Sequence, residues 1–245
     1  IGYLEDKLKF KKFWPVDVHI IGKDIIWFHT VYWPAMLKSA GIEMPKKIFS
    51  HGWWTVNSKK MGKSAGNTIS IDKLISYAGV DSARYFLLRE ASFGDDGDFD
   101  EKILIKRHNN ELANKLGNLI SRVSTLTEKQ GLEESALIDS KKIIKKVSEH
   151  IENMALDKAL NEIFYFIDIL NEYIQNKKPW ETKDKKVLYQ LVNGIKDSAI
   201  LLSPFMPESA EKIAKTFNFD ISLESLEKPL KISKIKKADI LFRKI

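Results

Sequence analysis

Two lysines three residues apart, in a polar segment with glycine and serine, are the side chains best suited to chemistry in this chain. The segment Lys60-Met61-Gly62-Lys63-Ser64 continues as Ala65-Gly66-Asn67. A loop of this composition can fold ammonium groups and backbone N–H groups around a polyphosphate. A solvated surface turn is the alternative, and it is the commoner fate of a lysine pair. A P-loop is excluded, because that motif needs glycine at position 57, where the chain has Asn57.

Gly22 and Asp24 stand where a nucleotide could bind. They follow the apolar run 16–21, which is typical of a short buried strand, and they precede a helical stretch that extends to about residue 40. The carboxyl end of a strand in an open parallel sheet is the usual place for a nucleotide. The alternative for Asp24 is the N-cap of the helix that follows.

Ile25, His29 and Trp33 recur every four residues along that helical stretch, so they form one stripe on it. The pattern by itself favours a core stripe that contains one hydrogen-bonded histidine.

Asn118 and Arg122 lie four residues apart, on the face of their predicted helix that is opposite to its apolar stripe. They offer an amide and a guanidinium in one direction, although any exposed helix shows such pairs. Trp180 follows Pro179 at a predicted helix start. An exposed tryptophan there could stack on an unpaired RNA base, and a core anchor is the alternative.

The elements that must position these residues divide the chain in two. The first hundred residues mix strand-like runs, at 16–21 and 48–56, with helices; Asp72 and Asp81 are predicted N-caps, and 94–101 is predicted as an exposed turn. Beyond residue 101, apolar residues follow the 3.6-residue period of helices over 110–127, 156–174 and 187–202. These helical faces must bury one another, which predicts an antiparallel helical bundle.

The composition of the 245 residues, with 44% apolar residues and a formal net charge of +7, is that of a folded chain with a modest basic excess. The excess suggests a polyanionic partner. No run of residues approaches the length that would span a membrane, so we expect no membrane association. Zero cysteine excludes thiolate chemistry and is compatible with the cytoplasm, and five scattered histidines give no metal-ligand spacing.

The segment KMGKSAGN resembles the KMSKS loop of class I aminoacyl-tRNA synthetases, with Gly62 in place of the first serine. Residues 18–33, HGWW at 51–54, DSARYFLLRE at 81–90 and NKLGNLISR at 114–122 resemble, in order, segments of the methionyl-tRNA synthetases. The resemblance implies an α/β fold, the second half of a Rossmann-type parallel-sheet domain, followed by an all-α bundle. It implies catalytic-domain residues 1–56, the KMSKS loop and a connecting, stem-contact region over 57–107, an anticodon-binding domain over 108–228, and a basic tail over 229–245.

The same resemblance implies a methionine–tRNA ligase, which activates methionine with ATP and transfers it to tRNA(Met). The catalytic side chains would be Lys63 and Lys60. The implied residues are, for ATP, Gly22, Asp24, His51, Gly52, Lys60, Lys63 and Ser64; for methionine, Tyr3, Ile25, His29 and Trp33; for the anticodon, Asn118, Arg122 and Trp180. Mg²⁺ is expected on the phosphates.

In this family the opening IGY lies inside a longer motif, so an N-terminal catalytic half, where zinc could bind, is expected as a partner chain or segment. Taken alone, the chain is not expected to be a competent enzyme. Two other functions stay open: a class I synthetase for Leu, Ile, Val or Cys, and a non-catalytic tRNA-binding subunit.

Overall fold

The computed structural model describes residues 5–56, 58–62, 66–92 and 94–245. The chain forms two compact units, each made from two pieces of sequence. The first comprises residues 1–67 and 93–99, and the second comprises residues 68–92 and 100–245. The first unit thus takes a short piece of chain, 93–99, from the predicted connecting region. Tyr3, Lys63 and Ser64 lie outside the described residues.

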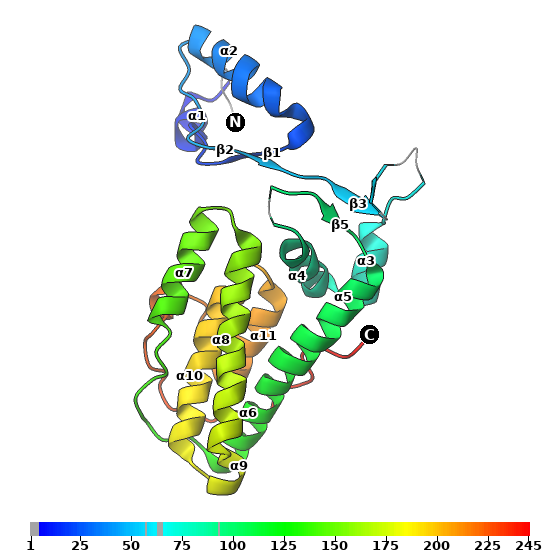
Figure 1. Ribbon diagram of the computed structural model, residues 1–245. Helices are drawn as coiled ribbons and strands as arrows, with labels where there is room; N and C mark the ends of the chain where they lie inside the picture. Colours follow the sequence, from blue (N-terminus) through cyan, green and yellow to red (C-terminus); the bar gives the residue numbers. More distant parts are fainter. Residues whose placement is uncertain (1–4, 57, 63–65, 93) are drawn as a thin grey trace. The chain divides into compact units, whose positions relative to one another are not determined.

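The first unit contains a parallel pair of strands joined by helical turns (Figure 1). β1 (His19–Gly22) pairs in parallel with β2 (Ile48–His51), and the helix α1 (Lys7–Phe13) precedes β1. The connection comprises η1 (Lys23–Ile25), the π-helix η2 (Phe28–Tyr32) and α2 (Trp33–Ser39). A helical crossover is what allows two strands to run in parallel. The prediction of a partial parallel sheet with a helix after β1 is therefore confirmed.

A second sheet, of three strands, contains the hairpin whose second strand carries Lys59 and Lys60, called the lysine hairpin below. β3 (Trp54–Val56) pairs antiparallel with β4 (Lys59–Lys60) and parallel with β5 (Gly97–Asp98). The prediction of an exposed turn over 94–101 is therefore wrong for its centre, where Gly97 is buried in the sheet. The acidic side chains explain the difference, because Asp98 accepts hydrogen bonds from the Thr55 hydroxyl at 2.5 Å and from the Ser58 N–H at 3.0 Å.

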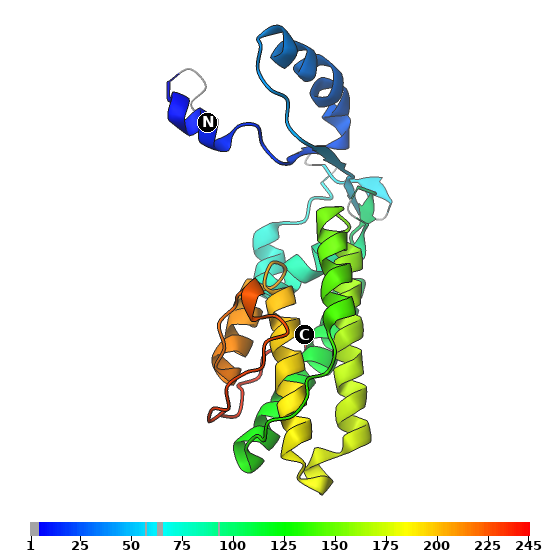
Figure 2. The same ribbon diagram turned by 90° about the vertical axis from the view of Figure 1, so that its left-hand side faces the viewer.

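The second unit is helical, as its apolar periodicity predicts. Figure 2 shows α8 and α10 side by side as long rods, with α11 (orange) on the flank. Its elements are α3 (Ile71–Ala78), α4 (Val80–Glu90), α5 (Glu101–Arg107), the π-helix η4 (His108–Gly117), α6 (Asn118–Gln130), α7 (Lys141–Glu152), α8 (Leu156–Lys177), α9 (Pro179–Thr182), α10 (Lys185–Leu202), α11 (Pro207–Phe217) and η5 (Leu223–Ser225).

The bundle buries the predicted stripes in one core. Leu112, Leu116, Leu119, Ile120 and Val123 are buried and contact the apolar faces of α8 and α10 in a single cluster, and Leu126 packs at its edge. The predicted helical bundle is confirmed.

The predicted N-caps at Asp72 and Asp81 are wrong. Ser70 caps α3, with its hydroxyl accepting from the Lys73 N–H, and Gly79 precedes α4. Asp81 is buried instead, and its Oδ2 accepts a hydrogen bond of 2.6 Å from the N–H of Ser209 in the first turn of α11. A carboxylate at this position satisfies a free N–H and complements the helix dipole. Asp81 therefore caps a helix 128 residues away, which local sequence cannot indicate.

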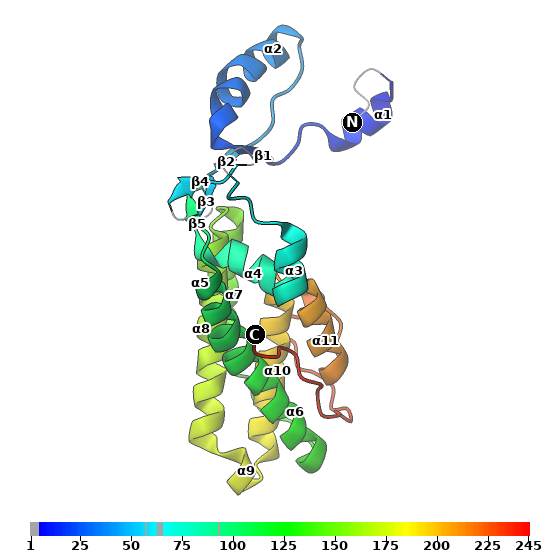
Figure 3. The same ribbon diagram turned by 90° about the vertical axis from the view of Figure 1, so that its right-hand side faces the viewer.

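The basic C-terminal segment packs against the bundle (Figure 3). Ile235 is buried in the core cluster, and the Tyr189 hydroxyl donates to the Leu230 carbonyl at 2.9 Å. At the end of the chain, the Asn109 side chain donates to the Ile245 carbonyl at 2.8 Å and accepts from its N–H at 3.1 Å. Residues 229–245 are thus pinned along their length to the helices.

Candidate functional site

Three predicted nucleotide-binding residues meet at the carboxyl edge of the parallel pair. Gly22 and His51 are register partners, each the last residue of its strand. A Cβ at Gly22 would lie 2.6 Å from Asp24 Oδ1 and 3.9 Å from His51 Cε1, so the three residues are immediate neighbours. Asp24 is exposed and is not the N-cap of η1, because Gly22 holds that position and no side chain caps it. The capping alternative for Asp24 is therefore wrong.

Gly52 follows this edge and is buried. A Cβ at Gly52 would lie 2.1 Å from the Asp95 carbonyl oxygen and 2.6 Å from the Asp96 N atom. Only glycine lets the two backbones approach this closely. Gly52 thus has a packing function in the structure, and its predicted contact with ATP stays a prediction.

Lys60 lies on β4 beside an aromatic ring that the sequence did not single out. Its Nζ is 3.6 Å from the centroid of the Trp53 ring, and Lys23 Nζ is 4.1 Å from the same centroid. Both are cation–π distances. The ring therefore contacts two cations near the carboxyl edge of the parallel pair, and the HGWW segment was the only sequence signal for it.

Asp96 fixes the position of this aromatic–lysine cluster. Its carboxylate accepts from Lys23 Nζ at 2.5 Å and from the Trp53 N–H at 2.8 Å. The hydrogen bond from Lys23, together with the one from the Trp53 backbone, holds the pKa of Asp96 below its ordinary value. Asp96 thus remains ionised near neutral pH and neutralises one of the two cations.

Asn67 closes the base of the lysine loop. Its Oδ1 accepts from the Gly62 N–H at 3.0 Å, and its Nδ2 donates to the Lys60 carbonyl at 3.2 Å. These bonds tie the two ends of a short loop together. Lys63 and Ser64 belong to that loop but lie outside the described residues.

Three of the four predicted methionine residues, Ile25, His29 and Trp33, share one face of the helical connection. His29 Nδ1 is 3.0 Å from the Ile25 carbonyl oxygen, and the rings of His29 and Trp33 are 5.8 Å apart. His19 of β1 joins them, with its ring centroid 4.8 Å from Trp33 and 5.3 Å from His29. Ile25 is 38% exposed, so the stripe is not a closed core. The structure thus adds His19, which the sequence did not single out.

The second unit brings together two of the three predicted anticodon residues. The Arg122 guanidinium carbon is 5.1 Å from the centroid of the Trp180 ring, and the Gln130 side chain donates to the Pro179 carbonyl at 3.1 Å, which fixes α9 to α6. Trp180 is 37% exposed, so the core-anchor alternative is wrong. Asn118 is exposed one turn before Arg122. The arrangement offers a ring face and a guanidinium to a base.

Over the ranges that the structure describes, no three side chains of the metal-binding types lie close enough together to hold an ion. A search of the same ranges for a helix long and apolar enough to cross a bilayer found none.

Family models match both parts of the chain. The model described as tRNA synthetases class I (M) covers residues 2–124, and the model described as anticodon-binding domain of tRNA ligase covers residues 134–243. The parallel strands, the lysine hairpin and the helical bundle are thus those of a class I tRNA synthetase with an anticodon-binding domain. The chain belongs to the family of class I tRNA synthetases that the first of these models describes by M, the methionine group.

Relatives of known name agree with this placement. The methionine–tRNA ligase of Caldanaerobacter subterraneus subsp. tengcongensis is 39% identical over all of this chain and 42% of its own length. That of Rickettsia conorii is 42% identical over 87% of this chain and 46% of its own. A solved structure, Mycobacterium tuberculosis methionyl-tRNA synthetase in complex with methionyl-adenylate, superposes with a TM-score of 0.91 at 33% identity, covering 98% of this chain and 53% of that one. The chain thus spans about half the length of these relatives.

Proposed function

We propose that this chain supplies part of the active site and the anticodon-binding bundle of a methionine–tRNA ligase. The reaction joins methionine to ATP as methionyl adenylate and then passes the methionyl group to a ribose hydroxyl at the end of tRNA(Met). The observation that carries the proposal is the Gly22–Asp24–His51 edge in the same compact unit as the lysine hairpin. A nucleotide at that strand edge would lie where such ligands bind in parallel sheets.

The lysines of the KMGKS segment would stabilise negative charge on the phosphates of ATP. When the methionine carboxylate attacks the α-phosphate of ATP, negative charge grows on the phosphate oxygens as pyrophosphate leaves, and Lys60 and Lys63 would neutralise it. No side chain need act as a nucleophile. Lys60 rests on Trp53, a contact worth about 0.5–1 kcal/mol at an exposed site, so it can leave the ring for a phosphate at small cost. Mg²⁺ would be held mainly by the phosphates of ATP, since the described residues offer no group of three metal-binding side chains.

Recognition of methionine and of the anticodon would be divided between the two units. The face formed by Ile25, His29 and Trp33 has the aliphatic and aromatic character that a thioether side chain needs. Trp180 and Arg122 would stack on and hydrogen-bond to splayed anticodon bases, with Asn118 one turn away. We place the activity in the cytoplasm, where tRNA is used for protein synthesis.

An N-terminal catalytic half would be the partner of the first unit. The helical connection exposes apolar side chains there, with Trp27 and Met36 both 68% exposed. An apolar face of this kind is characteristic of an interaction surface. The exposed face supports the proposal that a second segment completes the sheet and its active site.

The test is methionine-dependent exchange of pyrophosphate into ATP, with this chain and a separately produced N-terminal half of a relative. The chain alone should be inactive and the mixture active. In the mixture, Lys63→Ala should slow the exchange. The activation free energy should rise by about 2.7–4 kcal/mol, the loss expected for one preorganised charge contact. Methionine binding should barely change. Lys59→Ala is the matched control, because it removes the same charge from the residue beside Lys60.

Three outcomes would contradict the proposal. Exchange driven by Leu, Ile, Val or Cys but not by methionine would indicate another class I synthetase. Binding of tRNA without any exchange in the mixture would indicate a non-catalytic RNA-binding subunit. Equal exchange rates for Lys63→Ala and Lys59→Ala would show that the charge of Lys63 does not contribute to catalysis.

A further inference from the structure

A lysine-lined groove lies in the second unit, and its lining contains none of the residues proposed above for ATP, methionine or the anticodon. It is a cavity of about 700 Å³ between α11 and the C-terminal segment, with Ile120 of α6 also in its lining. Five lysines line it, namely Lys212, Lys215, Lys234, Lys236 and Lys237, against a single acidic residue, Asp239. Lysines therefore outnumber acidic residues in the lining of the groove by five to one.

Most of these ammonium groups have no ion-pair partner among the residues that the structure describes. Lys215 has a weak ion pair with Glu211 at 3.9 Å. The other four form no ion pair with any residue that the structure describes, and all five are exposed. Four unpaired cations around one groove repel one another, and an anionic ligand would relieve that repulsion.

The backbone beneath the lysines is fixed. The Asn218 side chain donates to the Lys234 carbonyl at 3.1 Å, and the Ala238 N–H donates to the Ser124 hydroxyl at 3.0 Å. The Lys237 N–H donates to Glu128 at 3.1 Å. Because hydrogen bonds already fix the backbone of the groove, little conformational entropy of the backbone is lost when an anion binds to its lysines.

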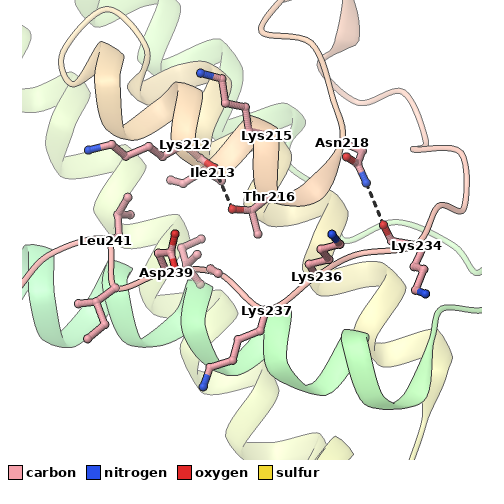
Figure 4. A pocket seen from close by; sticks show the side chains of 13 residues that line it. Lys212, Ile213, Lys215, Thr216, Asn218, Lys234, Lys236, Lys237, Asp239 and Leu241 are labelled. Atoms are coloured by element: carbon pink, nitrogen blue, oxygen red, sulfur yellow. Dashed lines mark hydrogen bonds between the residues drawn. The ribbon is translucent and has the colours of Figure 1, made fainter.

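We propose that this groove binds the phosphate backbone of RNA, independently of base sequence. Figure 4 shows the lysine side chains of the groove spread apart rather than converging on one point, an arrangement that fits a chain of phosphates better than a single anion. Lysine acts as a point charge on phosphate and does not read bases. The five lysines lie within residues 134–243, which match the anticodon-binding model, so RNA is the expected polyanion and this inference rests on the proposed function.

The groove is a second contact, distinct from the proposed anticodon readers. Ile120 lines the groove from α6, whereas Asn118 and Arg122 are two residues before and after it. Two residues along an α-helix correspond to a rotation of about 200°, which places the readers on the opposite side of α6. The anticodon readers would supply sequence preference and the groove would supply sequence-independent affinity.

The test measures RNA affinity of the full chain as a function of salt concentration. The groove variant carries Lys212→Ala, Lys234→Ala, Lys236→Ala and Lys237→Ala. The charge-matched control carries Lys141→Ala, Lys142→Ala, Lys145→Ala and Lys158→Ala, four exposed lysines outside the groove. A third variant with arginine at the four groove positions keeps the charge. Tripolyphosphate is titrated against each protein as the small-anion probe, and thermal unfolding checks that all variants fold.

At 0.1 M salt, the dissociation constant of the groove variant for RNA should be higher than that of the unmodified chain by about tenfold or more. The slope of log affinity against log salt concentration should be smaller in magnitude by about 2–3. The loss should be the same for the methionine tRNA and for one with an altered anticodon, and the arginine variant should retain binding. Equal losses in groove and control variants would overturn the inference, as would tight tripolyphosphate binding with unchanged RNA affinity. Failure of the proposed function is separable, because it would abolish the preference for the methionine anticodon and leave the groove-dependent salt slope intact.

Discussion

At the scale of single residues, the aromatic rings beside cations define both candidate sites. Trp53 lies beside Lys23 and Lys60, and Trp180 lies beside Arg122. In each case the ring orients a positive charge without neutralising it, since a cation–π contact leaves the formal charge in place. A phosphate or a base can then compete for the same cation.

Replacement of Trp180 by alanine should weaken binding of the methionine tRNA by about 1–3 kcal/mol, the value of one base stack. Adenylate formation in the reconstituted enzyme should be unchanged. The measurement is a dissociation constant from filter binding or fluorescence titration. Tyr165→Ala is the matched control, because Tyr165 is also an exposed aromatic residue of the bundle. A comparable loss in Tyr165→Ala, or parallel losses of RNA binding and stability in Trp180→Ala, would contradict a stacking function.

The carboxyl group of Asp96 gives a prediction about pH. Its pKa is lowered from the ordinary 3.8, first by the hydrogen bond from Lys23 and then by that from the Trp53 N–H. Because the pKa of Asp96 is lower in the folded than in the unfolded chain, ionised Asp96 stabilises the folded unit at any pH above its pKa in the unfolded chain. This stabilisation is lost as the pH falls through the pKa of Asp96 in the folded chain. The pairing of Asp96 should therefore persist at neutral pH and break only below about pH 4.

Substitution of Lys23 by glutamine should raise the pKa of Asp96 toward 3.8, as measured by carboxyl NMR titration. Lys60→Gln serves as the control and should raise it less, because Lys60 contributes the smallest of the charge effects on Asp96. The assignment fails if Lys23→Gln leaves the titration of Asp96 unchanged or moves it to lower pH.

At the scale of elements, α4 organises the bundle through its polar side chains. Asp81 caps α11, and Arg84 donates to the carbonyls of Phe205 and Pro204 at 2.9 and 2.8 Å. One short helix thus satisfies one free N–H at the start of α11 and two carbonyls in the turn after α10.

Replacement of Asp81 by alanine should reduce the free energy of unfolding by about 1–3 kcal/mol, because it leaves a buried N–H at the start of α11 without an acceptor. Asp81→Asn, which keeps an oxygen acceptor, should lose less. Asp72→Ala removes an exposed first-turn carboxylate and should cost at most about 1 kcal/mol. Urea denaturation monitored by circular dichroism measures all three, and similar losses for Asp72→Ala and Asp81→Ala would rule out the capping role.

The sequence predicts the elements well where a local period determines them, and it fails where contacts between distant residues decide. The side chains of the apolar stripe from Leu112 to Val123 are buried, as their spacing indicates. Asp81 resembles a local cap in sequence, yet its carboxylate accepts from the N–H of Ser209. The close approach of Gly52 to the backbone of Asp95 also has no signal in the local sequence. The Trp53 cluster and the groove of Lys212 could not be found either, because each joins segments that are far apart in the chain.

At the scale of the whole molecule, the two units differ in how much they bury. The large apolar core cluster, to which α8 and α10 contribute, lies in the second unit. In the described part of the first unit, the buried apolar side chains larger than alanine are those of Ile21 and Leu37. Burial of apolar surface is the main source of folding free energy. The first unit should therefore be the less stable of the two.

Hydrogen exchange followed by mass spectrometry should resolve this difference. Amides of α8 and α10 should exchange only through global opening, whereas those of η2 and α2 should open at a free energy lower by about 3 kcal/mol or more, because little buried surface holds them. Addition of the proposed N-terminal half should raise protection in η2 and α2, where Trp27 and Met36 are exposed, and should leave α8 unchanged. Protection that is uniform across both units, or unaltered in α2 when the two halves form an active mixture, would contradict the assignment of that apolar face to the partner.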